Sequence, residues 1–278
     1  MTIRIVTDST CDLPGEAAAA AGITVVPMLV KVGSQEYRDG IDLGRRVFYE
    51  QLSTYQPYPT TAVPGAEIFT QVYRQLAAEG ASQILSIHIM AGLSTVPEVA
   101  RTAAQAVTGA EVIVLDSRSI SLGAGFQALR AAHMAAEGRS LAEILAALQS
   151  QAQRTHVVAL LDVLEYLQRS GRMHSAVAGL GQLLRFKPLV KIHNGESAAE
   201  GVRTRERATE RLVQVLNEIG PLEQAGIIHS NAPDRVDDLL HKAGPLLPPG
   251  EIPVVDITPV IGVHTGPNAV GFACVAIG

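Results

Sequence analysis

The chain has 278 residues, of which 47% are hydrophobic and 18% charged, with a formal net charge of −5 at pH 7. This composition supplies enough apolar surface for more than one core, and it excludes an intrinsically disordered chain. The acidic balance argues against a general nucleic-acid or anionic-membrane binder, because both functions need a basic surface. We therefore expect no nucleic-acid partner.

Targeting segments and metal-binding patterns are not evident in the sequence. The start, MTIRIVTDST, has an apolar stretch too short for a signal peptide, and no later run approaches the length of a membrane helix. Cys11 and Cys274 lie near opposite ends of the chain, and the eight histidines are scattered. We expect reduced thiols, no metal site, no cofactor and a cytoplasmic protein.

In the first half of the chain, short buried runs alternate with Ala-rich amphipathic segments. The predicted strands are Ile3–Thr7, Ile23–Val30, Gln83–His88 and Glu111–Asp116. The predicted helices are Leu13–Ala21, Ala66–Glu79, Pro97–Val107, Gly123–Glu137 and Leu141–Arg154. This alternation is typical of βαβ units around a parallel sheet, in which ligands bind outside the carboxyl ends of the strands.

The pattern changes after about residue 155. The predicted strands there are His156–Leu161, Leu189–His193, a run toward Arg203, Ala225–His229, Ile252–Thr258 and Gly271–Ile277. The predicted helices are Val163–Arg169, a segment through Leu184, Thr204–Ile219 and Pro233–Lys242. An Asn194-Gly195 dipeptide between two strand-like runs indicates a hairpin. We predict a two-domain α/β fold, with a parallel-sheet domain over 1–155 and a mixed-sheet domain over 156–278.

Two polar segments in the first half are candidates for a ligand site. Thr7–Thr10 follows the first strand and is either a ligand-facing loop or a turn, with Asp12 capping the next helix. Pro59–Pro64 contains Thr61 between prolines that stiffen the backbone. The threonine hydroxyls there suit a carboxyl group, since each can donate and accept a hydrogen bond. The alternative is an ordinary turn before the next helix.

Ser94 lies between a predicted strand and a predicted helix, and could be a nucleophile, a ligand donor or a helix cap. The surrounding residues Gly92 to Val96 lack the second glycine of the G-x-S-x-G frame of serine hydrolases. Farther on, Gly123 and Gly125 form a G-x-G, but residue 128 is alanine where a dinucleotide-binding loop has its third glycine. These glycines indicate close helix packing instead.

The segment Pro259–Asn268 carries a histidine, His264, between two glycines. We expect this segment to be a loop before the final strand. His264 is either a structural histidine or a hydrogen-bond partner of a ligand, since flanking glycines allow another group to approach the backbone closely.

Taken together and in order, these segments resemble the DegV family along the whole chain. The motifs that carry the resemblance are Val6–Leu13, Val25–Pro27, Tyr37–Leu43, Thr61–Pro64, Leu93–Val96, Asp116–Gly125, Leu164–Arg172, Lys187–Leu189, Val202–Arg205 and Pro259–Pro267. The resemblance implies a two-domain α/β protein that binds a long-chain fatty acid such as palmitate in a tunnel between its domains. It also implies a non-enzymatic carrier, which presents the carboxyl group to a separate ATP-dependent fatty-acid kinase.

The resemblance further assigns residues. The head-group hydroxyls fall on Thr61 and Ser94, His264 is placed close to the carboxyl group, and Arg203 takes the position implicated in kinase cooperation. Ala62 and Val63 stand where the family pattern has serine and glutamine, which implies a drier head-group pocket. The competing hypothesis is a hydrolase or acyl-transfer enzyme that uses Ser94 with His264.

Basic residues are concentrated in one part of this acidic chain. They are Arg169, Arg172, Arg185, Lys187, Arg203, Arg205, Arg207 and Arg211. Most of them are expected to pair with neighbouring acidic residues on a solvated helix face. For Arg203 we favour docking to an acidic kinase surface, or transient contact with an anionic membrane.

Overall fold

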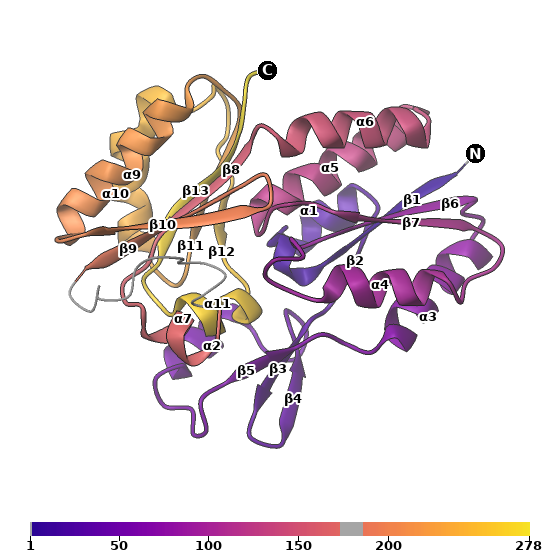
Figure 1. The fold of residues 1–278 in the computed structure, drawn as a ribbon, viewed down its shortest axis with the longest axis horizontal. Coiled ribbons are helices and arrows are strands. Elements are labelled where there is room, and N and C mark those ends of the chain that lie inside the picture. Colours follow the sequence, from indigo (N-terminus) through magenta and orange to yellow (C-terminus); the bar gives the residue numbers. More distant parts are fainter. Residues whose placement is uncertain (1, 173–185) are drawn as a thin grey trace.

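The computed structural model describes residues 2–172 and 186–278, whose strands form three sheets (Figure 1). The strands are β1 Ile3–Asp8, β2 Ile23–Val26, β3 Leu29–Val32, β4 Gln35–Arg38, β5 Thr60–Ala62, β6 Gln83–His88, β7 Glu111–Asp116, β8 Thr155–Leu160, β9 Lys187–His193, β10 Glu196–Val202, β11 Leu222–His229, β12 Val254–Asp256 and β13 Val270–Ala276. The α-helices are α1 Gly15–Ala20, α2 Arg45–Gln51, α3 Ala66–Ala78, α4 Val96–Ala104, α5 Leu122–Ala136, α6 Leu141–Ala152, α7 Glu165–Arg169, α9 Arg205–Ile219, α10 Pro233–Ala243 and α11 Pro259–Thr265. Two 3-10 helices are η1 Ser9–Cys11 and η2 Gly244–Leu246.

The first large sheet is parallel, in the strand order β2-β1-β6-β7. Helices α3 and α4 cover one face of it, and α5 and α6 cover the other (Figure 1). Helix α6 begins with a capping box, in which Ser140 and Glu143 satisfy each other's backbone N–H groups. The parallel sheet with helices on both faces confirms the prediction from alternating apolar strands and helices.

The second large sheet is mixed, in the order β10-β9-β8-β13-β11-β12, with only β11 and β12 parallel. Strands β9 and β10 form the predicted hairpin, and its turn residues Asn194 and Gly195 have φ of 48° and 83°. Along β8 the side chains alternate between two cores, since Val158 packs beneath α9 and α10 while Val157 joins the core on the opposite face. The mixed sheet confirms the predicted fold class, and the predicted domain boundary at 155 stays a prediction.

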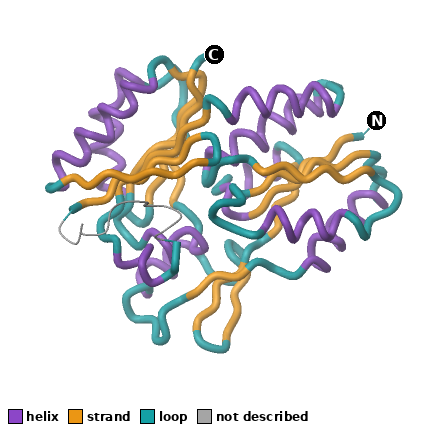
Figure 2. The backbone as a smooth tube through the Cα atoms, viewed as in Figure 1, coloured by secondary structure: helices purple, strands orange, loops and turns teal. Residues whose placement is uncertain are grey.

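Two predictions about local structure in the first half of the chain were wrong, and one in the second half lies outside the described residues. Ile23–Val30 is two strands, β2 and β3, in different sheets, because Pro27 cannot donate to a ladder and the chain turns there. Strands β3, β4 and β5 form a small antiparallel sheet that protrudes from the rest (Figure 2). Asp12 does not cap α1, which begins at Gly15; it ends η1 in a left-handed conformation. The helix predicted through Leu184 falls in 173–185.

The two large sheets share a continuous core. One cluster of buried side chains runs from the parallel sheet through α5 to Val157, Ile192 and Ile228 of the mixed sheet. Gly123 permits α5 to approach the mixed sheet, because a Cβ there would lie 2.7 Å from Val157 Cγ2 on β8, and Gly125 permits the packing of α5 on η1, because a Cβ there would lie 2.7 Å from the carbonyl oxygen of Cys11. Packing therefore explains the G-x-G pattern, as predicted. Cys11 and Cys274 are both buried free thiols.

Candidate functional site

A cavity lies where the carboxyl edge of the parallel sheet faces the mixed sheet. Its volume is about 150 Å³. Its apolar lining comes from both halves of the chain and consists of Met28, Ala62, Val63, Ile89, Leu93, Ile120, Val157, Ala159, Leu161, Leu167, Val190, Ile192, Ile228, Ile257, Val260, Ile261, Ala269 and Val270. Its polar lining is Thr10, Thr61, Ser94, Ser121, Arg172, His229, His264 and Thr265. A mostly aliphatic wall with a few polar groups is the usual composition of a small-molecule site.

Thr61 and His264 meet in this wall although 203 residues separate them. Thr61 lies on β5, and its Oγ1 is 3.1 Å from Nε2 of His264. His264 lies on α11 and not in the predicted loop, because Pro259 starts a short helix that runs to Thr265. Side chains of Val260, Ile261 and His264 line the cavity, so one face of α11 forms part of its wall.

His264 is neutral at physiological pH. Burial, reinforced by the nearby Arg172 guanidinium, lowers the pKa of His264 to about 4. Its Nδ1 is buried and has no partner among the described residues. A neutral imidazole with one nitrogen on Thr61 can offer the other nitrogen to a ligand as donor or acceptor, depending on its tautomer.

Ser94 lines the same cavity from the loop between β6 and α4. It is not the N-cap of α4, which is Thr95; its Oγ accepts a long hydrogen bond of 3.4 Å from the N–H of Val96. Its own hydroxyl proton remains available to a ligand. The histidine of this site pairs with Thr61, so the serine–histidine pair that a hydrolase needs is not formed between Ser94 and His264 in this structure.

Sequence analysis missed Arg172 as a site residue and treated it only as part of the basic segment. It follows the short helix α7, lines the cavity and is close enough to His264 to disfavour a second positive charge there. Its Nη1 donates to the carbonyl oxygen of Ser170 at 3.0 Å. Ala62 and Val63, which stand where the family pattern has serine and glutamine, also line the cavity, and the drier head-group pocket stays a prediction.

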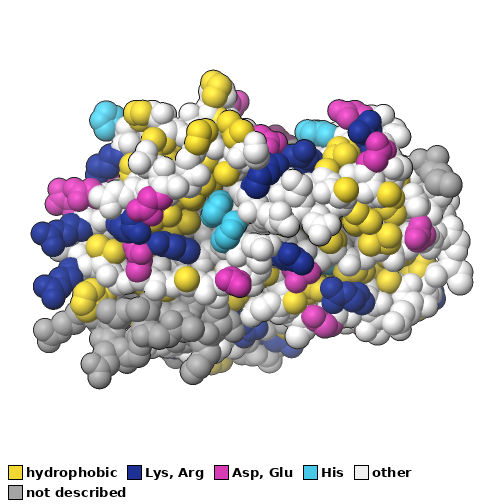
Figure 3. Space-filling view, turned by 45° about the horizontal axis from the view of Figure 1, so that its top comes forward, with side chains coloured by type: hydrophobic (Ala, Val, Ile, Leu, Met, Phe, Trp, Pro, Cys, Tyr) yellow, Lys and Arg dark blue, Asp and Glu magenta, His cyan; other side chains and the backbone are white. Residues whose placement is uncertain are grey.

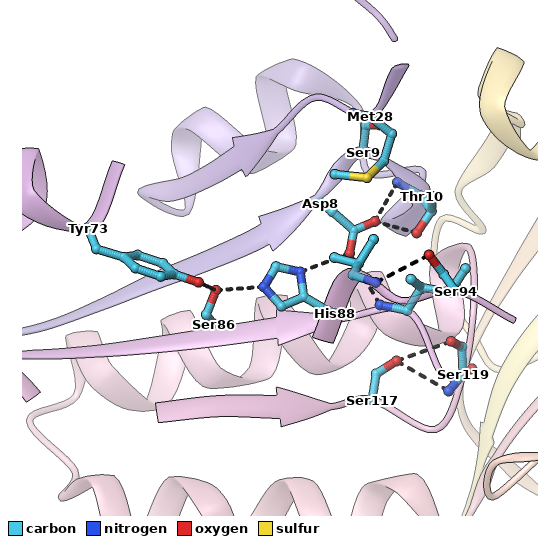
Figure 4. Close-up of polar contacts among 12 residues, drawn as sticks. Asp8, Ser9, Thr10, Met28, Tyr73, Ser86, His88, Ser94, Ser117 and Ser119 are labelled. Carbon is cyan, nitrogen blue, oxygen red and sulfur yellow. Dashed lines mark hydrogen bonds and ion pairs between the residues drawn. The ribbon is translucent and has the colours of Figure 1, made fainter. Parts of the chain in front are cut away.

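Behind the cavity wall lies a buried chain of hydrogen bonds (Figure 4). Tyr73 OH donates to Ser86 Oγ at 2.8 Å, Ser86 Oγ is 2.7 Å from His88 Nε2, and His88 Nδ1 is 2.9 Å from Asp8 Oδ2. The Ser86–His88–Asp8 order resembles a hydrolytic triad. However, Ser86 and His88 are 0% exposed and do not line the cavity. We interpret this chain as structural support for the loops after β1 and β6.

Four of the eight basic residues form ion pairs within the described chain, one of them Arg169 with Glu165. Lys187 and Arg205 both pair with Asp162, and Arg211 pairs with Glu200 and Glu218. Figure 3 shows the same mixture, with Lys and Arg next to acidic side chains on the side of the mixed sheet. Arg185 lies outside the described residues.

Arg203 differs from these paired residues. It is exposed at the end of β10, and its guanidinium lies 6.0 Å from the ring centroid of Phe186. Across 2–172 and 186–278, no carboxylate forms an ion pair with it. Its charge is therefore available to a partner.

No cluster of three or more potential metal ligands occurs in the described part of the chain. In that same part, every helix is too short or too polar to cross a bilayer. The site consists of a mostly aliphatic cavity with a neutral polar group, Thr61 with His264, in its wall. The fold is α/β, and the composition of this cavity suits a small, largely apolar molecule.

Comparison with known proteins identifies the family. A family model described as "Uncharacterised protein, DegV family" matches residues 2–276. A DegV domain-containing protein of Streptomyces coelicolor is 34% identical over 273 residues, which are 97% of this chain and 96% of the relative. The chain belongs to the DegV family.

Two solved structures extend this relationship to the whole fold. One, described as "Fatty Acid Binding of a DegV family Protein from Thermus thermophilus", has a TM-score of 0.91 and 34% identity, and the match covers 100% of both chains. The other is DegV of Bacillus subtilis, described as a fatty acid binding protein, with a TM-score of 0.90, 30% identity and 99% of both chains covered.

Proposed function

We propose that the protein binds one long-chain fatty acid, such as palmitate, with its chain in the aliphatic cavity and its carboxyl group at Thr61, Ser94 and His264. The observation that carries this proposal is the pairing of Thr61 with His264 in the wall of an otherwise aliphatic cavity. The description of two relatives with the same fold as fatty-acid-binding proteins supports it.

The physical chemistry of the cavity suits such a ligand. Each methylene removed from water contributes about 0.8 kcal/mol, so a long acyl chain supplies most of the gross affinity. Part of this is offset by the cost of ordering the ligand and the cavity. Neutral hydroxyls and a neutral imidazole can hold a carboxyl group in either protonation state, while Arg172, the one arginine or lysine among the described lining residues, favours the carboxylate.

A titration with palmitate tests this assignment. Thr61→Val and Ser94→Ala should each raise the Kd by about fivefold or more, the loss expected for one hydrogen bond to a charged or partly charged group. Thr102→Val is the matched control, because its hydroxyl donates to Glu98 O on the exposed side of α4. Wild-type affinity in both site variants would contradict the proposed head-group site.

We further propose that the protein is a carrier and not itself a catalyst, and that it presents the carboxyl group to a separate ATP-dependent fatty-acid kinase. Arg203 is the proposed docking residue, since it is exposed and carries a charge that the described chain leaves unpaired. An exposed, unpaired cation at an interface mainly raises the association rate with an acidic partner.

Arg203→Ala should therefore slow acyl-phosphate formation by a partner kinase without changing the Kd for palmitate. Arg139→Ala is the control, since Arg139 is likewise an exposed arginine but forms an ion pair with Glu143. Equal rates for wild type and Arg203→Ala would overturn the docking assignment. Slower transfer of palmitate to anionic vesicles with an unchanged kinase rate would assign Arg203 to membrane contact instead.

A further inference from the structure

Two hydroxyl residues in the cavity wall have no role in the head-group site. Thr10 follows β1, and Ser121 precedes α5. The N–H of Ser121 donates to the carbonyl oxygen of Thr10 at 2.9 Å, so the two residues are neighbours. Both line the cavity, and they are only 3% and 2% exposed.

The hydroxyl proton of each residue is committed to a buried carboxylate. Thr10 Oγ1 donates to Asp8 Oδ1 (Figure 4), and Ser121 Oγ donates to Asp12 Oδ2. Burial opposes ionisation of Asp8, but hydrogen bonds from His88 and Thr10 outweigh it and the pKa of Asp8 is lowered. Burial raises the pKa of Asp12 to about 6, which leaves it mostly ionised at pH 7.5. An ionised carboxylate only accepts hydrogen bonds, so both hydroxyls must act as donors to it.

The two hydroxyl oxygens therefore offer only lone pairs to the cavity. Among the described residues, no donor reaches either oxygen, so each keeps lone pairs that can accept a hydrogen bond. Ser121 also holds an uncommon backbone conformation, with φ of 53° and ψ of −145°. Such strain persists where the surrounding structure fixes a residue in place for a specific contact.

The position of this pair separates it from the head-group site. Asp12 Oδ1 accepts the N–H of Thr258 at 2.8 Å, which ties Ser121 to the start of α11. His264 lies six residues farther along, which is about 9 Å at the helical rise of 1.5 Å per residue. A group bound at Thr10 and Ser121 is thus several carbons away from a carboxyl group bound at His264.

We infer that Thr10 and Ser121 form an acceptor-only subsite for a hydroxyl group on the acyl chain, so that the cavity takes a hydroxylated fatty acid. This inference rests on the proposed function, because it assumes a fatty acid whose carboxyl group is at His264. The ligand hydroxyl donates to one or both oxygens, which supplies the donor that the described chain lacks.

The test is a binding comparison of stearate with a positional series of hydroxystearates. We call the position whose hydroxyl group reaches Thr10 and Ser121 the matching position. For the hydroxystearate with its hydroxyl group there, the ratio of the stearate Kd to the hydroxystearate Kd should be about fivefold or more lower in Thr10→Val than in wild type, the loss expected for one hydrogen bond. Thr102→Val is the matched control, because its hydroxyl donates to Glu98 O and does not line the cavity, and it should leave this ratio at the wild-type value. Thermal melting verifies that each variant is folded.

A second comparison needs no variant. The oxostearate with its carbonyl group at the matching position accepts but does not donate, so it should bind wild type at least about fivefold more weakly than the hydroxystearate. The inference is overturned if, for every hydroxystearate, the ratio of the stearate Kd to the hydroxystearate Kd is the same in wild type and in Thr10→Val. It is also overturned if wild type binds the oxostearate as tightly as the hydroxystearate. In either case stearate itself still binds. Failure of stearate and all hydroxystearates to bind would instead refute the proposed function.

Discussion

Protonation of His264 should destabilise the ligand-free protein at acidic pH. Burial lowers the pKa of His264 to about 4 from the 6.5 of an exposed histidine. Well above pH 6.5 neither state binds the proton, so this histidine has no effect on stability there. As the pH falls from 6.5 to 4, the unfolded state binds the proton first and the folded state loses stability. At pH 5 these two pKa values give a loss of about 2 kcal/mol, an upper value because His264 lines a cavity that admits water.

Urea unfolding of lipid-free protein at pH 7.5 and pH 5 measures this effect. His264→Gln keeps a neutral polar side chain but cannot titrate. Between pH 7.5 and pH 5, the free energy of unfolding of this variant should therefore fall by up to about 2 kcal/mol less than that of wild type. His156 has its pKa lowered to about 4 by burial and by His193, and His156→Gln should remove a separate contribution of the same sign. Equal losses of stability in wild type and His264→Gln would refute the argument that His264 is buried in its neutral form.

Three further outcomes follow from the packing and the site. Asp8→Asn removes the charged acceptor for His88 and Thr10 and should lower the free energy of unfolding by about 2–4 kcal/mol in urea titrations; a loss below 0.5 kcal/mol would show that the network is not structural. Gly271→Ala places a Cβ against Val158 O of the neighbouring strand, and circular-dichroism melting should show a lower Tm than wild type. Arg172→Gln should weaken binding of palmitate but not of hexadecanol, because only the carboxylate is attracted by the cation; equal weakening of both would assign Arg172 a packing role.

Much of the fold could be predicted from local patterns. β-Branched runs bounded by polar residues correctly indicated β1, β6, β7 and β8, and the Asn-Gly dipeptide indicated the β9–β10 hairpin. The single strand predicted over Ile23–Val30 failed at Pro27, where the N–H of the next residue, Met28, donates to Ser9 Oγ and not to a sheet. Proline inside an apolar run was the signal for this break.

The candidate site was harder to predict, because its parts come from distant segments. Nothing local to Thr61 indicates a contact with a residue 203 positions away, and only the ordered motifs suggested His264 as a partner. The histidine was expected in a loop because two glycines flank it, but Pro259 nucleates the helix that carries it. The donor or acceptor character of Thr10 and Ser121 depends on tertiary contacts with Asp8 and Asp12, which no sequence pattern specifies.

The central claim is that the cavity holds one long-chain fatty acid. Organic extraction of the purified protein, followed by denaturing mass spectrometry with an internal standard, measures this directly. We predict close to one equivalent of long-chain fatty acid per chain, with saturated and hydroxylated forms resolved by mass. An extract free of fatty acid, together with a Tm that does not rise when palmitate is added to the protein, would contradict the claim.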